Sequence, residues 1–374
     1  MNGIYGTSEM RRGVVVAISL SILLSTLSLP DGRNVERWKG EQWHPYEPAH
    51  RCSILMDNDS AAHFIYHQND RHIEHWFEWW YLNIKGDDGN NLLVEFFTFR
   101  NLSNPLTSLV GVVVLFMPAD GSTFESVKTY PFIRYTLDYE KCNVTIDGDR
   151  FSEVAENEYA VRYHNNVNDV NLMLNVSGVT ESLPGLSMVL EDRQWMEWRS
   201  HVPLGKAKGV FSYRDFNGYH EYHICGRGYH DHNWGIAKFR SLDWEWGEFS
   251  DSEIPLSVVY GLVRSENDSF TGGLYFSDET THYALLWPDI HIEYEGWEWI
   301  NGFKKPVKLS MRGTSNNVSA NVTIVLERAY VVGIGTVGMP YLMGKLSGEV
   351  EIHGKRYTLS SITGFYEHHF FNWW

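Results

Sequence analysis

The groups best suited to proton chemistry are concentrated in Gly226–Gly235, which reads Gly-Arg-Gly-Tyr-His-Asp-His-Asn-Trp-Gly. A polar cluster enclosed by aromatic residues is the arrangement that proton transfer to an apolar substrate requires. We interpret Asp231 as the candidate acid and His232 as its partner. The substrate-binding candidates of this segment are Tyr229, His230 and Trp234.

A second carboxylate lies among aromatic residues, in the segment Trp76–Leu82. Because side chains alternate along a strand, Glu78, Trp80 and Leu82 would share one face, and Phe77, Trp79 and Tyr81 would cover the other. Both faces are therefore expected to be covered. Glu78 is the second candidate for the acid, and Trp80 is a further substrate-binding candidate. The alternative is a structural Glu78 that accepts hydrogen bonds from Trp and backbone donors.

Two histidines of the first segment, His230 and His232, would point to the same face of a strand and could hold a metal ion together. A third ligand could come from His220, His368 or Asp231. Hydrogen-bonded histidine pairs are the commoner arrangement in β cores, so we expect no metal ion. Nucleophilic hydrolysis lacks its usual signature, since the chain contains no G-x-S-x-G motif.

Charge and motif content exclude several other functions. Gly333–Gly338 matches G-x-G-x-x-G, but Met339-Pro340 follows at once and no βαβ unit surrounds it, so we expect no cofactor. The net charge is −16, from 31 basic and 47 acidic residues. This charge opposes binding to nucleic acid or to an anionic membrane surface. The expected partner is an apolar small molecule.

The N-terminus indicates an exported protein. In residues 1–30, two arginines precede an uncharged run, Gly13–Leu29, as in a signal peptide or a short signal-anchor. We expect the body to be extracytoplasmic, either secreted or anchored to the membrane by this segment if it is uncleaved. Three distant cysteines form no disulfide framework and no zinc motif. One pairing, Cys52 with Cys142, is left open.

The body has the pattern of an all-β protein. Residues 31–70 are polar and irregular, and from about residue 75 the chain consists of short runs rich in β-branched and aromatic residues, such as Leu92–Phe99. Asp-Gly and Asn-Gly dipeptides separate many of these runs, which indicates hairpins. At 374 residues the chain suits two domains. We predict two antiparallel barrels, over residues 71–238 and 239–374.

Three segments together, Glu78–Leu82, Gly228–Gly235 and Gly364–Glu367, resemble the carotenoid 1,2-hydratase (hydroxyneurosporene synthase) family and its AttH-like relatives. The resemblance spans about residues 70–370, and the central motif is the most specific of the three. It implies two tandem lipocalin-like β-barrels and members that hydrate isoprenoid alkenes. Lipocalin-like Diels–Alderases and tocopherol cyclases look related in architecture.

The resemblance also implies roles for single residues. His232 and Trp234 match the functional His-x-Trp of that family. Its hydratases carry a Tyr-x-Asp strand further along the chain, whose Asp is taken as the proton donor. The matching strand here contains Tyr260, which becomes a substrate-binding candidate, but Leu262 stands at the Asp position. That departure argues against carotenoid hydration as the reaction.

These observations favour chemistry on alkenes. Adding water to an isolated alkene, or closing a ring on it, requires protonation by a carboxylic acid of raised pKa, and aromatic faces stabilise the resulting cation. We predict a hydratase- or cyclase-type lyase acting on a large apolar isoprenoid or lipid substrate. Trp234 and Tyr260 would face the cation. Two alternatives are a lipid carrier without chemistry, which Leu262 favours, and a metal-assisted hydrolase.

Overall fold

A computed structural model of the chain describes residues 60–130, 134–190, 194–238, 242–264, 270–300, 302–332 and 339–370. The predicted leader, residues 31–59 including Cys52, and Gly333–Gly338 lie outside the described residues. Ser60–Trp374 forms one compact unit. Within the described ranges, no helix combines the length and the apolar character needed to cross a bilayer.

The described chain is almost entirely β-structure, as predicted. Its short helical turns are α2 (Phe64–His67), η1 (Ile73–His75) and η2 (Val167–Asp169). The strands of the N-terminal sheet are β1 (Trp76–Gly86), β2 (Asn91–Phe99), β3 (Leu109–Met117), β4 (Phe124–Tyr130), β5 (Tyr135–Leu137), β6 (Asn143–Ile146), β7 (Asp149–Ala155), β8 (Glu158–Asn165), β9 (Val170–Gly178), β10 (Leu186–Val189), β11 (Trp195–Asp215) and β12 (Gly218–Ile236). The strands of the C-terminal sheet are β13 (Trp244–Phe249), β14 (Leu256–Arg264), β15 (Phe270–Asp278), β16 (His282–Leu286), β17 (Ile290–Ile300), β18 (Phe303–Thr314), β19 (Val318–Val332), β20 (Met339–Ile352) and β21 (Lys355–His369).

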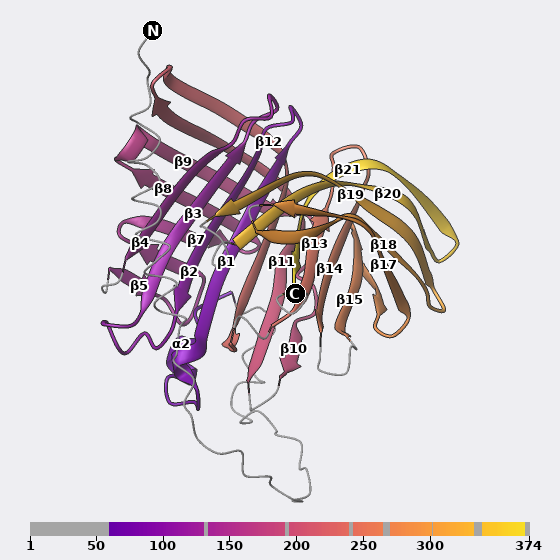
Figure 1. Cartoon of the computed structure of the whole chain (residues 1–374), viewed down its shortest axis with the longest axis horizontal. Coiled ribbons are helices and arrows are strands. Elements are labelled where there is room, and N and C mark those ends of the chain that lie inside the picture. Colours follow the sequence, from indigo (N-terminus) through magenta and orange to yellow (C-terminus); the bar gives the residue numbers. More distant parts are fainter. Residues whose placement is uncertain are drawn as a thin grey trace, which may run out of the picture. The chain divides into compact units, whose positions relative to one another are not determined.

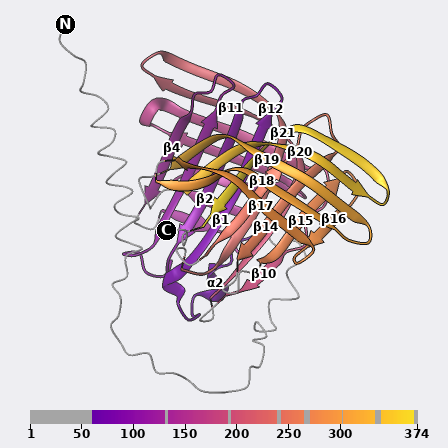
Figure 2. The ribbon, with the colours of Figure 1, turned by 45° about the vertical axis from the view of Figure 1, so that its right-hand side comes forward.

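Both sheets have the same connectivity. The N-terminal order is β4-β3-β2-β1-β12-β11-β9-β8-β7-β6-β5, with β10 paired to β11, and the C-terminal order is β16-β15-β14-β13-β21-β20-β19-β18-β17. Each sheet is an antiparallel meander whose first strand pairs with its last, β1 with β12 and β13 with β21. Both sheets curl in Figures 1 and 2, where the N-terminal sheet runs from indigo to salmon and the C-terminal sheet from salmon to yellow. The predicted all-β, tandem lipocalin-like fold is confirmed as two curled half-barrel sheets.

Turn residues and glycines explain the tight hairpins and the close strand packing. In the β6–β7 hairpin, Asp147 and Gly148 have φ values of 50° and 90°, the left-handed geometry that a two-residue turn requires. In the predicted motif, a Cβ on Gly226 would lie 2.0 Å from the carbonyl oxygen of Lys85. Glycine therefore lets β12 lie directly against β1.

The side chains of β1 divide between two apolar clusters, as strand alternation predicts. Trp80 belongs to a cluster inside the N-terminal sheet. Phe77 and Tyr81 belong to a second cluster, which also contains Trp246 of the C-terminal sheet and so joins the two sheets. A third cluster fills the inside of the C-terminal sheet. Each face of β1 is thus covered, and each can hold a site.

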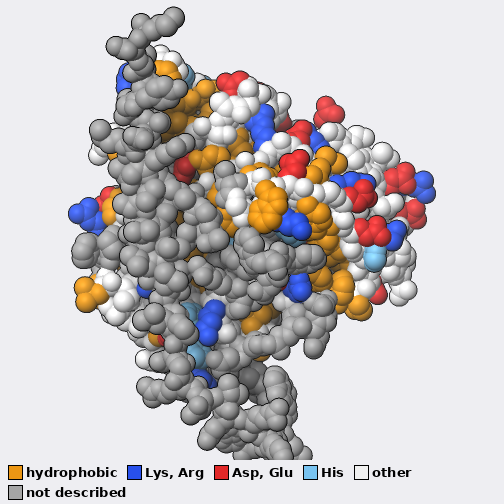
Figure 3. All heavy atoms as spheres, in the orientation of Figure 1, with side chains coloured by type: hydrophobic (Ala, Val, Ile, Leu, Met, Phe, Trp, Pro, Cys, Tyr) orange, Lys and Arg blue, Asp and Glu red, His pale blue; other side chains and the backbone are white. Residues whose placement is uncertain are grey.

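Polar contacts also join the sheets. A buried ion pair links Lys85 Nζ on β1 to Glu248 Oε2 on β13. Arg328 Nη1 donates a hydrogen bond to the carbonyl oxygen of Pro118 at 3.1 Å. On the surface, Figure 3 shows acidic and basic side chains interspersed over the C-terminal sheet.

Candidate active site

A pocket lies between the two sheets, inside the apolar cluster that joins them, and contains about 60 Å³ of space. Aromatic side chains from both sheets form its wall, among them Trp198 and Trp246. Four acidic residues line it from four different strands, Glu95 on β2, Asp231 on β12, Glu245 on β13 and Glu367 on β21. Such a combination of apolar wall and convergent acids is typical of an active site.

Asp231 is held by three hydrogen-bond donors. Its Oδ2 accepts from Trp198 Nε1 and from the Tyr229 hydroxyl, each at 2.9 Å. Its Oδ1 accepts from Asn233 Nδ2 at 3.1 Å. Burial raises the pKa of Asp231 to about 7; these donors oppose the shift and the nearby Glu367 adds to it. Tyr229, a predicted substrate-binding residue, therefore contacts the predicted acid directly.

Two further carboxyl groups of the pocket, Glu367 and Glu95, also have raised pKa values. Glu367 accepts one hydrogen bond at Oε2, from Trp244 Nε1 at 2.7 Å, and burial raises its pKa to about 7. Glu95 accepts a hydrogen bond at Oε2 from the Tyr341 hydroxyl at 3.1 Å. Burial and then the charge of Glu367 raise the pKa of Glu95 to about 8. Because like charges disfavour ionisation, the pocket retains protons near neutral pH.

His232 does not face this pocket, which corrects the expected partnership with Asp231. Neighbouring side chains of a strand point to opposite faces, so His232 lies inside the N-terminal sheet, with Nε2 3.1 Å from Glu78 Oε1. His63 Nδ1 lies 3.4 Å from the same oxygen, and the His63 backbone N–H donates to it at 2.7 Å. All three side chains are fully buried. Burial raises the pKa of Glu78 and lowers that of His232.

Three further residues expected to bind substrate beside Asp231 also lie on this inner face. The ring of Trp80 stacks on His232 with centroids 4.7 Å apart, and Trp234 stacks on His63 at 3.9 Å. His230 is fully buried, with Nδ1 2.8 Å from a backbone carbonyl oxygen of β1. These residues enclose the Glu78 cluster, because their places in β1 and β12 alternate with those that line the pocket.

Tyr260 and Leu262 occupy different surroundings in the C-terminal sheet. Tyr260 is fully buried in that sheet's inner cluster, with its ring against Gly247, so the expected role as a pocket wall beside Trp234 is corrected. Leu262 lines the pocket between the sheets. At the position where the hydratases carry their acid, this chain therefore places an apolar side chain in the pocket.

The third metal ligands considered from the sequence lie elsewhere. His220 Nε2 is 3.0 Å from Asp215 near the end of the β11–β12 hairpin. His368 contacts Glu245 across β13 and β21. Neither approaches His232. The side chains that surround His232 are therefore set by the tertiary fold and not by the spacing of histidines in the sequence.

Two residues of these clusters, Glu95 and His63, are not predicted from the sequence, and a third, Glu367, is given no role there. The sequence does contain a signal for Glu95, because it is a single carboxylate in the apolar run Leu92–Phe99. Glu367 appeared only as part of the C-terminal segment that carries the resemblance. His63 left no signal, since it lies in a polar, irregular stretch and reaches the sheet only through the tertiary fold.

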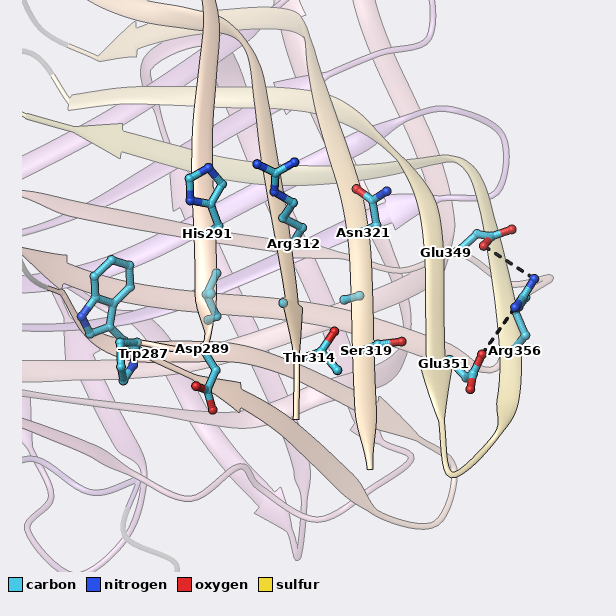
Figure 4. A pocket seen from close by; sticks show the side chains of 14 residues that line it. Trp287, Asp289, His291, Arg312, Thr314, Ser319, Asn321, Glu349, Glu351 and Arg356 are labelled. Carbon is cyan, nitrogen blue, oxygen red and sulfur yellow. Dashed lines mark ion pairs between the residues drawn. The ribbon is translucent and has the colours of Figure 1, made fainter. Parts of the chain in front are cut away.

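A larger depression of about 770 Å³ lies on the outer face of the C-terminal sheet (Figure 4). His291, Arg312 and Asn321 stand in a row there, on the paired strands β17, β18 and β19. Arg356 forms ion pairs with two acidic residues of β20, at 3.9 and 3.5 Å. This surface is open and polar and its charges are exposed. It lacks the enclosed acids of the inter-sheet pocket, so we place the candidate site in that pocket.

Comparisons with known proteins agree on the fold. No family model matches the sequence, and no curated protein matches it. A candidate AttH of Nitrosomonas europaea is 14% identical with a TM-score of 0.59, over 88% of this chain and 100% of that chain. CghA, solved with Sch210972, is 12% identical with a TM-score of 0.59, over 79% and 89% of the two chains. Kievitone hydratase from Nectria haematococca is 10% identical with a TM-score of 0.55, over 84% and 94%. The chain therefore shares the lipocalin-like fold of these proteins, in agreement with the AttH-like resemblance of its motifs.

Proposed function

We propose that the protein is a hydratase- or cyclase-type lyase that protonates an alkene of a large isoprenoid or lipid substrate in the pocket between the two sheets. The observation that carries this proposal is the convergence of Glu95, Asp231 and Glu367 on an enclosed aromatic pocket. Protonated carboxylic acids near neutral pH are the donors that alkene activation requires. The fold shared with kievitone hydratase supports a hydratase-type role.

The hydrogen bonds divide the acids into a donor and an acceptor. Asp231 receives three donors, which stabilise a charged carboxylate. Both pKa values are about 7, but Glu367 receives only one hydrogen bond among the described residues, so Glu367 is the better place for the proton that the two acids share. We assign Glu367 as the proton donor and Asp231 as the proton acceptor. This assignment changes the role expected of Asp231 from the sequence.

The reaction balances with these two groups. Glu367 transfers its proton to one alkene carbon, the π electrons form the new C–H bond, and the other carbon becomes a carbocation. The faces of Trp244 and Trp246 stabilise that cation. In hydration, water forms the C–O bond as Asp231 takes one of its protons. In cyclisation, a second alkene attacks and the product loses a carbon-bound proton to Asp231. Proton return from Asp231 to Glu367 restores the site.

The pocket must widen to admit a large substrate, because about 60 Å³ holds little more than the reacting group. Three methionines, Met188, Met196 and Met339, form part of its wall. Methionine is unbranched and adapts to irregular shapes. A wall of this kind suits a long, flexible hydrocarbon chain.

The test is conversion of a panel of polyprenyl alkenes by the full chain, followed by mass spectrometry. We expect a product heavier by one water, or a cyclised isomer of unchanged mass. Glu367→Gln and Asp231→Asn should each lower the rate by about 100-fold or more with little change in substrate binding. Glu349→Gln, in the outer depression, should keep the rate of the unmodified protein. Binding of every alkene without conversion would contradict the proposal and favour a carrier.

A further inference from the structure

The cluster of His63, Glu78 and His232 takes no part in the proposed chemistry, because it lies on the opposite face of β1 and β12 from the pocket. Each residue offers one ligand atom, and these atoms all lie within 4.8 Å of one another. His63 Nδ1 and His232 Nε2 are 3.4 and 3.1 Å from Glu78 Oε1. Ligand atoms that surround a tetrahedral zinc ion at about 2.0–2.2 Å lie roughly 3.3–3.6 Å apart. The observed spacing therefore fits such an ion with small side-chain adjustments.

Several buried polar atoms around this cluster have no hydrogen-bond partner among the described residues. They are Glu78 Oε2, His232 Nδ1, His201 Nε2 and His230 Nε2. His201 stands where the β11–β12 register shifts between Ser200 and Val202, and such an irregularity re-aims a side chain. Its ring lies 6.3 Å from that of His232. Buried polar atoms are nearly always hydrogen-bonded. The unpaired atoms therefore indicate that the interior of the N-terminal sheet binds a polar ligand.

The charges of the cluster favour a cation as that ligand. Among the described residues, Glu78 forms ion pairs only with His63 and His232, and no lysine or arginine pairs with it. Stacking on Trp234 and Trp80 fixes the planes of these two imidazole rings. Two imidazoles and one carboxylate form a donor set that zinc favours.

We propose that His63, Glu78 and His232 bind a divalent transition-metal ion, zinc foremost, inside the N-terminal sheet. His63 precedes α2, whereas Glu78 and His232 lie on β1 and β12. The ion therefore fastens the segment before β1 to the two central strands. It enters as the sheet closes around it, because all three ligands are fully buried in the folded protein. A bound water would contact the remaining nitrogens of His201 and His230.

The proposal is tested first on the unmodified full chain. Elemental analysis of protein purified without added chelator should find about one zinc ion per chain. Protein unfolded with chelator and refolded with Co²⁺ should show the visible ligand-field bands of a tetrahedral site. Refolding in zinc should raise the Tm relative to refolding in chelator. Absence of bound metal, together with a Tm that does not respond to zinc, would overturn the proposal.

Variants separate metal binding from simple hydrogen bonding. Glu78→Gln keeps the shape and one acceptor oxygen but removes the charge, and His63→Gln removes an imidazole. Each should lower the zinc content to about a tenth of the unmodified value or less and lower the Tm in zinc. His220→Gln, at a histidine that pairs with Asp215 away from the cluster, should retain the metal. If Glu78→Gln instead raises the Tm and the metal content is unchanged, the cluster is only a hydrogen-bonded core.

Discussion

Replacement of Glu95 by glutamine tests whether the pocket keeps protonated carboxyl groups. Burial raises the pKa of Glu95 from 4.5 to about 8. Below pH 4.5 the Glu95 carboxyl is protonated in both the folded and the unfolded protein, so its burial does not lower the free energy of unfolding. Between pH 4.5 and 8 the folded protein holds a proton that the unfolded chain releases, so stability falls as the pH rises through this window. At about 1.4 kcal/mol per pKa unit, the free energy of unfolding should fall by on the order of 3 kcal/mol between pH 5 and pH 8.

The Glu95→Gln variant has no carboxyl group to ionise at this position, so it lacks this fall in the free energy of unfolding. Glutamine is close in shape and still accepts the hydrogen bond from the Tyr341 hydroxyl. The variant should therefore match the unmodified protein near pH 5 and exceed its stability by roughly 3 kcal/mol at pH 8. The other acids that act on Glu95, Glu367 and Asp231, are present in both proteins. Urea denaturation across this pH range measures the difference between the two slopes.

The matched control is Glu298→Gln, since Glu298 is an exposed residue of β17. Its stability should follow that of the unmodified protein at every pH. Parallel stability curves for the unmodified protein and Glu95→Gln would refute the reasoning. They would mean that Glu95 ionises in the folded state as readily as in water, so the pocket would not be a desolvated site.

Three other substitutions test the packing that supports the site. Lys85→Met leaves the buried Glu248 without its cation and should lower the free energy of unfolding by about 3–5 kcal/mol; urea denaturation should show most of this loss restored when Glu248→Leu is added. Phe151→Ala opens a cavity inside the N-terminal sheet and should cost about 3–5 kcal/mol by the same assay, and a cost below about 1 kcal/mol would contradict the burial. Trp246→Leu removes an aromatic face of the pocket and should slow product formation roughly tenfold, whereas an unchanged rate would remove Trp246 from the cation-binding wall.

The fold was largely accessible from the sequence because strand signals are local. Period-two alternation in Trp76–Leu82 predicts two covered faces, and the structure places Trp80 inside the sheet and Tyr81 between the sheets. Asp-Gly pairs predict tight turns, and Asp147-Gly148 has the left-handed backbone that such a turn needs. These rules involve residues a few positions apart, which a single sequence displays directly.

The composition of the site was accessible only in part, because it depends on pairings far along the chain. Glu95 and Tyr341 are separated by 246 residues and belong to different sheets. His63 and Glu78 meet because the chain before β1 folds back onto that strand. Asp231 was found from its neighbours in sequence, but the same reasoning joined it to His232, which alternation places on the other face. Local pattern thus identifies the strand that carries the candidate site, whereas only the fold shows which face of the strand lines the pocket.

The two faces of β12 explain why such different groups are adjacent in one motif. A strand that is covered on both sides carries two independent sets of side chains in alternate positions. In Tyr229–Trp234, Tyr229, Asp231 and Asn233 form one set of hydrogen bonds toward the second sheet. The residues between them point into the N-terminal sheet, toward Glu78. The inner set fixes the central strands, and the outer set places one acid, Asp231, against the second sheet. Neither set needs contact with the other, so the motif combines a scaffold and the proposed reaction site in six consecutive residues.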